Sequence, residues 1–171
     1  MAKEQTLIVV KPDGVSRNLV GEIIRRYEAG GLRVAALKML KASAPLIKKH
    51  YPAKKDYIMS LAGKGRKAGD PLASRDPVGY GMMIVTGMRK YMTEGPVVAM
   101  ILEGENAIKK AREITGYTDP SAADKGTIRG DLGEDTILKA NKERRPVKNL
   151  IHASGNADEA KYEIKLWFGK R

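Results

Sequence analysis

Residues 96–102 form a segment in which every side chain is apolar, Pro-Val-Val-Ala-Met-Ile-Leu. A strand with one face in water alternates apolar and polar residues, so this unbroken run predicts a central β-strand that is buried on both faces. The chain has 171 residues, of which 42% are hydrophobic, and this is enough for one sizeable core. We therefore expect a single domain over residues 1–171.

Short strands and amphipathic helices flank this run. Residues 6–10 and 32–40 are rich in β-forming residues, and residues 149–152 form another apolar strand-like run. Helices are predicted after the first strand, after the central strand at 107–114, and before Trp167, because apolar residues recur there with helical spacing. The order strand, helix, strand, followed by strand, helix, strand, predicts an α+β fold. It is the ferredoxin-like split βαβ sandwich, a four-stranded antiparallel sheet with helices on one face.

Other stretches have no clear period. Residues 52–81 are rich in glycine and lysine, and we interpret them as a basic excursion before a helix at about 82–92. Residues 116–126 predict a long polar loop, and 127–131 a short extended or turn segment. A further helix is expected within residues 132–141.

The formal net charge of +12 favours polyanionic partners, which are nucleic acid, an anionic membrane surface or a phosphorylated small molecule. Only 5% of the residues are aromatic, so a platform for stacking bases would be thin. The absence of cysteine excludes disulfides, thiolate catalysis and cysteine-based zinc sites, and it fits a cytoplasmic location. No apolar run approaches the roughly 20 residues that cross a bilayer, so we expect a soluble protein without a membrane partner.

His152 ends the last predicted strand, and Glu163 lies on the inward face of the helix that follows. Ala160, Glu163, Ile164 and Trp167 have the i, i+3, i+4, i+7 spacing of one buried stripe. A buried carboxylate needs a hydrogen-bonded or cationic partner, and His152 is the nearest candidate in sequence. Taken alone, the pair is better explained by a core histidine paired with a structural glutamate than by a nucleophilic or acid/base histidine.

Three cations occupy positions from which they could meet His152. Lys11 ends the first predicted strand, Arg112 flanks the helix after the central strand, and Arg129 lies in the segment 127–131. Each could equally be a solvated surface cation. Several fixed cations around a neutral nucleophile suit phosphoryl transfer, because catalysis there is mostly positioning and charge neutralisation. The chain has no Walker-type phosphate loop.

Four motifs occur in order along the chain. They are Lys-Pro-Asp-Gly-Val at 11–15, Gly-Pro-Val-Val-Ala-Met at 95–100, Gly-Thr-Ile-Arg-Gly-Asp at 126–131 and Asn-Leu-Ile-His-Ala-Ser at 149–154. Together they closely resemble the motifs of nucleoside diphosphate kinases. The resemblance covers nearly the whole chain except residues 56–80 and 133–148, which we interpret as insertions.

The resemblance implies a ping-pong reaction. A nucleoside triphosphate, typically ATP, would phosphorylate His152, and the phosphohistidine would then transfer the group to a different nucleoside diphosphate. Magnesium would accompany the nucleotide and be held mainly by its phosphates, without a metal site on the protein. The implied partners are nucleoside triphosphates and diphosphates, with further copies of the chain in a homo-oligomer.

The resemblance also implies roles for individual residues. The catalytic group comprises His152, Glu163, Lys11, Tyr51 and Ser154. The nucleotide-binding group comprises Lys11, Arg112, Thr118, Arg129 and Asn149.

The chain departs from the family pattern at three places. Gly155 stands near the nucleophile where many relatives continue Gly-Ser-Asp-Ser, although Asn156 and Glu159 can still form a capping box for the last helix. The base-stacking phenylalanine of the family has its nearest counterpart at Ile84. A phosphate-contacting histidine of some relatives corresponds to Lys54.

A basic nucleic-acid-binding module on the same fold is the competing hypothesis. It is motivated by the net charge and by the lysine-rich excursion, in particular Lys64, Arg66 and Lys67. We rank it second because charge has many causes, whereas four ordered motifs have few.

Overall fold

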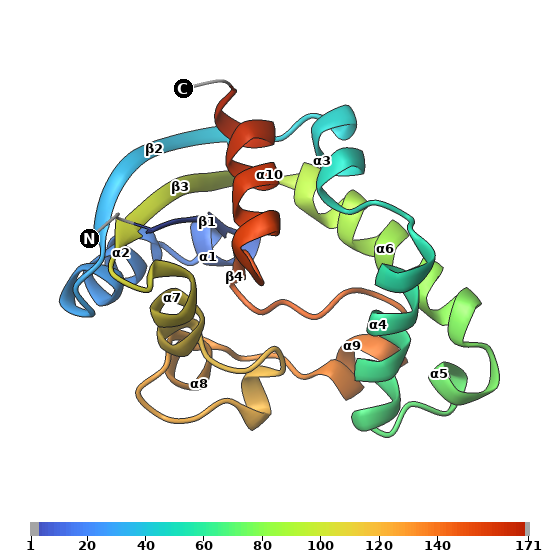
Figure 1. Cartoon of the computed structure of the whole chain (residues 1–171). Helices are drawn as coiled ribbons and strands as arrows, with labels where there is room; N and C mark the ends of the chain where they lie inside the picture. Colours follow the sequence, from blue (N-terminus) through green and yellow to red (C-terminus); the bar gives the residue numbers. More distant parts are fainter. Residues whose placement is uncertain (1–3, 170–171) are drawn as a thin grey trace.

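A computed structural model describes residues 4–169. Its sheet has four antiparallel strands in the order β2-β3-β1-β4 (Figure 1). The strands are β1 (Glu4–Val10), β2 (Arg33–Lys41), β3 (Pro96–Gly104) and β4 (Ile151–Ala153). This confirms the predicted α+β fold and places the apolar run of β3 at the centre of the sheet.

Helices cover both faces of the sheet, so the expectation of helices on one face is wrong. Along β1, Ile8 and Val10 belong to one buried cluster, and Leu7 and Val9 belong to a second cluster on the opposite face. The first cluster packs against α2 (Val20–Ala29) and α7 (Ala107–Thr115), and the second against α3 (Ala44–His50) and α10 (Ala157–Phe168), which crosses the sheet in Figure 1. Two central strands buried on both faces require both covers.

Two short helices form where turns or extended chain were predicted. Directly after β1, the chain forms α1 (Pro12–Ser16), which begins with proline at its first position. The segment predicted as extended contains α8 (Ile128–Leu132), because the Thr127 side chain accepts a hydrogen bond from the Gly130 amide at 3.1 Å and caps the helix. The remaining helical elements near the site are a 3-10 turn (Pro120–Ala122) and α9 (Ile137–Lys142).

The basic excursion is helical. It contains α4 (Lys55–Lys67), α5 (Pro71–Arg75) and the start of α6 (Pro77–Glu94), which begins before the predicted residue 82. Two glycines allow α4 and α6 to approach closely, since a Cβ on Gly65 would lie 2.5 Å from the Tyr80 ring and one on Gly81 would lie 2.5 Å from Ile58. The glycines that disguised the helical period are therefore packing residues.

Within residues 4–169, no helix combines the length and the apolar character needed to span a membrane.

Candidate active site

A cavity of about 500 Å³ opens beside β4, within the usual size range of small-molecule sites. Its walls come from α7 and α8 on one side and from α4, α6 and α9 on the other, and these groups of helices stand apart in Figure 1. Most of the residues singled out from the sequence line this cavity, and they are Lys11, Tyr51, Ile84, Arg112, Thr118, Arg129, Asn149 and His152. Glu163 and Ser154 lie buried directly behind His152.

His152 is held by a carboxylate on the side away from the cavity. Its Nε2 lies 2.8 Å from Oε1 of Glu163, and the Ser154 hydroxyl donates to Oε2 of the same carboxylate at 2.6 Å. The carboxylate accepts hydrogen bonds only, so it keeps the imidazole proton on Nε2 and leaves a lone pair on Nδ1. The structure thus presents an oriented nitrogen nucleophile in a cavity lined by cations.

His50, which the sequence reasoning missed, packs against the His152 ring. The two ring centroids are 4.3 Å apart, and Nδ1 of His50 accepts a hydrogen bond from the Trp167 indole at 3.2 Å. Burial, followed by the nearby His152 and Lys11, holds the pKa of His50 well below its usual value, so the ring stays neutral. Its only sequence signal was a histidine at the end of an amphipathic helix.

His50, His152 and Glu163 are also a group whose ligand atoms could hold a metal ion together, since these atoms lie within 4.8 Å of one another. The contacts just described already use His50 Nδ1, His152 Nε2 and both oxygens of Glu163. A metal bound by Glu163 would therefore compete with the hydrogen bonds from His152 and Ser154 to this carboxylate. The arrangement favours the positioning of an imidazole over metal ligation.

Lys11 reaches the cavity from the end of β1, next to β4. Its ammonium donates to Oδ1 of Asn149 at 2.7 Å, and the Asn149 amide donates to the Thr118 carbonyl at 2.8 Å. Burial, assisted by the positive charge of Arg129, lowers the pKa of Lys11 from 10.5 to about 8. Burial and Arg129 thus disfavour the charged form of Lys11, and a bound anion would stabilise it. This is expected at a binding site for an anion.

Arg129 extends from α8 to the start of β4, where backbone carbonyls fix its guanidinium. Nε donates to Asn149 O at 3.0 Å, one terminal nitrogen to Gly116 O at 3.0 Å, and the other to Ile151 O at 2.5 Å. Burial lowers its pKa to about 10, which still leaves it charged at neutral pH. Its positive charge is not neutralised by these carbonyls and remains available to an anion in the cavity.

A buried network supports the chain just before β4. The Tyr91 hydroxyl donates to Oδ1 of Asp13 at 2.7 Å, and Oδ2 of Asp13 accepts the Leu150 amide at 3.0 Å. Leu150 has a φ of 69°, a left-handed conformation that a branched side chain adopts only under constraint. The network supplies this constraint and thereby fixes the backbone that leads into β4, the strand that carries His152.

Part of the cavity lining is apolar. Ile84, the predicted counterpart of the base-stacking residue, lies there with Tyr57, Leu61 and Met88. Tyr51 also lines the cavity, and its burial raises its pKa well above the usual value. Lys54 is exposed at the start of α4 and does not line the cavity.

Glu159 contacts the chain at Gly155, where the sequence departs from the family pattern. The Gly155 amide donates to Oε2 of Glu159 at 2.8 Å, and Oδ1 of Asn156 accepts the Glu159 amide at 2.9 Å. Asn156 therefore caps the helix as predicted, whereas the Glu159 carboxylate bonds the Gly155 amide and the Asn156 side chain instead of the Asn156 backbone amide of a full capping box. The Glu159 carboxylate thus lies beside Gly155, in the first turn of α10.

Comparisons with known proteins find relatives along nearly the whole chain. The family model "Nucleoside diphosphate kinase" matches residues 4–59 and 80–171. A nucleoside diphosphate kinase of Pyrobaculum aerophilum is 45% identical, over 98% of this chain and 96% of its own, and nucleoside diphosphate kinase A of Mus musculus is 39% identical, over 96% and 86%. The match omits residues 60–79, in agreement with the first predicted insertion. It includes 133–148, where the second insertion stays a prediction.

Solved structures give the same result. A crystal structure of an NDP kinase from Pyrobaculum aerophilum has a TM-score of 0.90 and 41% identity, and it covers 98% of this chain and 96% of its own. A nucleoside-diphosphate kinase of Borrelia burgdorferi, solved as a transition-state mimic with bound vanadate and ADP, has a TM-score of 0.79 and 33% identity, with coverages of 97% and 87%.

Proposed function

The chain belongs to the nucleoside diphosphate kinase family and transfers phosphate between nucleotides, and we propose that His152 carries the phosphate between two half-reactions. The observation that supports this proposal is the bond of 2.8 Å between His152 Nε2 and Glu163, because it leaves Nδ1 free. The other features of the cavity are assigned to the attack on phosphorus, to the stabilisation of phosphate charge and to contact with the base.

In the first half-reaction, Nδ1 of His152 attacks the terminal phosphorus of a nucleoside triphosphate. A nitrogen–phosphorus bond forms, and the bond from phosphorus to the bridging oxygen breaks and leaves a nucleoside diphosphate with its electron pair. The imidazole gains positive charge as it attacks, and the carboxylate of Glu163 stabilises this charge through Nε2. In the second half-reaction, a terminal oxygen of another diphosphate attacks the phosphorus and His152 regains its lone pair.

The cations stabilise the phosphate charge during transfer. Arg129 is held rigidly by three carbonyls and Lys11 by Asn149, so neither needs to reorganise when the phosphorus moves. Arg112 lines the same wall of the cavity. We assign the apolar part of the lining at Ile84 and Met88 to the base, where apolar contacts without hydrogen-bond donors would permit several bases.

Magnesium fits this cavity as a companion of the nucleotide. Glu159 is the one carboxylate in the described lining, and its two oxygens already accept hydrogen bonds. Mg²⁺ prefers oxygen ligands and commonly uses substrate phosphates together with water. When bound, it would neutralise phosphate charge, and we propose that the phosphates hold it.

The phosphate-carrier role is tested with ATP labelled on its terminal phosphate. The protein should acquire a label that is lost in acid and stable in base, and His152→Gln should abolish it. His50→Gln is the matched control, because His50 is the other histidine in the sequence. Labelling that persists in His152→Gln, with both variants shown to be folded by circular dichroism, would exclude the mechanism. Removal of Mg²⁺ by a chelator should also stop labelling.

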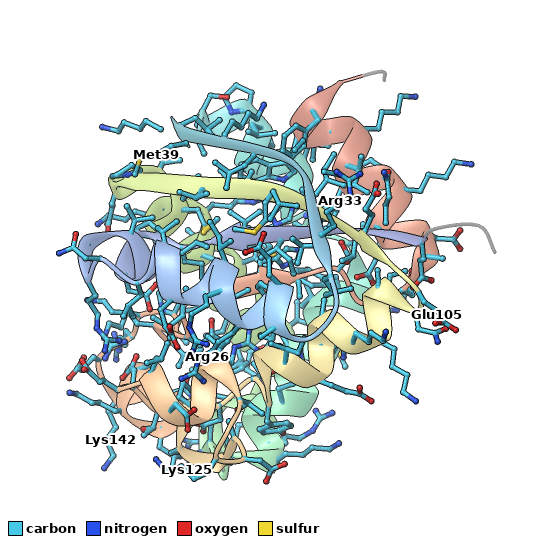
Figure 2. All side chains as sticks on the ribbon, turned by 90° about the vertical axis from the view of Figure 1, so that its left-hand side faces the viewer. Arg26, Arg33, Met39, Glu105, Lys125 and Lys142 are labelled. Atoms are coloured by element: carbon cyan, nitrogen blue, oxygen red, sulfur yellow. The ribbon has the colours of Figure 1, made fainter. Side chains whose placement is uncertain are left out.

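We further propose that the chain forms a homo-oligomer through strand β2. This strand is an edge of the sheet, and its side chains Leu37 and Met39 are 46% and 58% exposed. Met39 lies at the rim of the molecule (Figure 2). An exposed apolar edge strand is a surface for pairing with another chain. Light scattering should show an oligomer that Met39→Lys weakens, and a monomeric wild-type chain would refute the proposal.

Nucleic-acid binding stays a second hypothesis. Arg66 and Lys67 are exposed on α4, whereas Lys64 lines the cavity. If the hypothesis holds, binding to DNA or RNA should fall steeply with salt and survive His152→Gln. A flat salt dependence would count against it.

A further inference from the structure

Helix α4 supplies a cation to the cavity from a segment that the family model does not match. The matched residues stop at 59 and resume at 80, so Lys64 belongs to the unmatched segment. Lys64 nevertheless lines the same cavity as Lys11, Arg112 and Arg129. In Figure 1, α4 stands across from α7 and α8, the helices that carry Arg112 and Arg129.

The orientation of Lys64 follows from the packing of α4. Ile58, Ala62 and Gly65 are buried, and Gly65 lies against the Tyr80 ring of α6. This face of α4 is fixed against α6.

The neighbouring face of α4 is therefore fixed toward the cavity. Tyr57, Ser60, Leu61 and Lys64 have the i, i+3, i+4, i+7 spacing of one helical stripe, and all four line the cavity. Lys64 thus ends a row of cavity residues whose direction is set by the helix as a whole. It is not a flexible lysine on an unconstrained loop.

The charges around the cavity are unbalanced. Its described lining has four cations, from Lys11, Lys64, Arg112 and Arg129, and one carboxylate, from Glu159. Burial, and then the charges of Arg129 and Arg112, lower the pKa of Lys64. Although Lys64 keeps much of its surface exposed, its ammonium therefore lies close enough to the arginines to be repelled by them. A polyanion bound in the cavity would attract these cations and so offset the repulsion between them.

We propose that Lys64 contacts the phosphates of the bound nucleotide, as a specificity-determining cation that the insertion adds to the site. The inference rests on the proposed function of the cavity and extends it to the unmatched segment. A lysine ammonium is a compact charge on a flexible stem, suited to following phosphates whose position changes between diphosphate and triphosphate. The insertion is then a wall of the nucleotide site.

The test compares Lys64→Gln with Lys67→Gln. Both changes remove one positive charge from the last turn of α4, but Lys67 is exposed and does not line the cavity. By calorimetry, Lys64→Gln should raise the Kd for ADP about tenfold, as expected for the loss of one charge-assisted hydrogen bond. Binding of adenosine, which has no phosphate, should not change. Lys67→Gln should bind both ligands as the wild type does, and Lys64→Arg should recover most of the ADP affinity.

Two outcomes would overturn the inference. One is an unchanged Kd for ADP in Lys64→Gln. The other is an equal loss for adenosine and ADP, which would mean that Lys64 only supports the shape of the wall. Lys64→Ala serves as a second variant, with circular dichroism confirming that α4 is intact. Because calorimetry needs no phosphate transfer, these outcomes are separate from the labelling experiment on His152.

Discussion

Replacing Glu163 by glutamine removes one buried negative charge and keeps the shape of the side chain. Glu163 is 6% exposed and bonds both His152 Nε2, at 2.8 Å, and the Ser154 hydroxyl, at 2.6 Å. It does not line the cavity, so it acts through His152 as a positioning residue. We expect Glu163→Gln to slow the formation of phosphohistidine with little effect on nucleotide binding.

The expected size follows from the two hydrogen bonds. A bond to a charged group contributes about 1.5–3 kcal/mol, against about 0.5–1.5 kcal/mol for a neutral one. The His152 bond gains strength during attack, as the ring becomes positive, and this gain is lost with glutamine. The difference of about 1–1.5 kcal/mol between the two kinds of bond corresponds to a rate lower by roughly 5- to 13-fold. The Ser154 bond exists before and after attack, so its weakening affects stability more than rate.

Trp167 provides the assay. It is the single tryptophan, and its indole bonds His50, whose ring packs against His152. Rapid mixing with ATP should therefore give a fluorescence change that reports phosphorylation in one turnover. The concentration of ATP at half-maximal rate should stay near the wild-type value, and the maximal rate should fall.

The control is Glu113→Gln, which makes the same chemical change on the exposed side of α7, where Glu113 pairs only loosely with Lys109 at 3.9 Å. It should phosphorylate at the wild-type rate. A Glu163→Gln protein that is folded and phosphorylates within about twofold of the wild-type rate would refute the positioning role. A loss confined to ATP affinity would refute it as well.

Two further changes test the wall and the charge of the cavity. Gly65→Ala should lower the free energy of unfolding by about 1–3 kcal/mol, because its Cβ would lie 2.5 Å from the Tyr80 ring. In Gly63→Ala the nearest atom is 3.9 Å away, so urea titration should show a neutral change or a gain of up to about 1 kcal/mol; equal effects of both variants would contradict the packing argument. For Lys11, a pKa of about 8 in the free protein means that the ammonium is lost as pH rises through 8, so the Kd for ADP should increase above that pH and binding should take up protons. A Kd that is constant between about pH 7 and 9.5 would show that Lys11 does not contact phosphate.

Much of the fold could be predicted because its signals are local. The apolar run of β3 and the amphipathic helix α7 have periods that are visible in the sequence, and their order fixes the antiparallel sheet. Lys11 and His152 could be placed together because each ends a strand, and β1 and β4 are neighbours, with Val9 opposite His152. The Glu163 partnership followed from helical spacing, because an inward carboxylate requires a partner.

The features that the sequence did not determine depend on contacts between distant segments. Nothing local marks His50 as a neighbour of His152, or shows that Arg129 is held by the carbonyls of three separate residues. The glycines of α4 weakened its helical signal, since glycine has a low helix propensity, and only the approach of the Tyr80 ring explains Gly65. The sequence thus determined the sheet and the chemical groups of the site. Tertiary packing decided which cations share the cavity. The charge of a side chain can be read from the sequence, but its neighbours depend on how the helices pack.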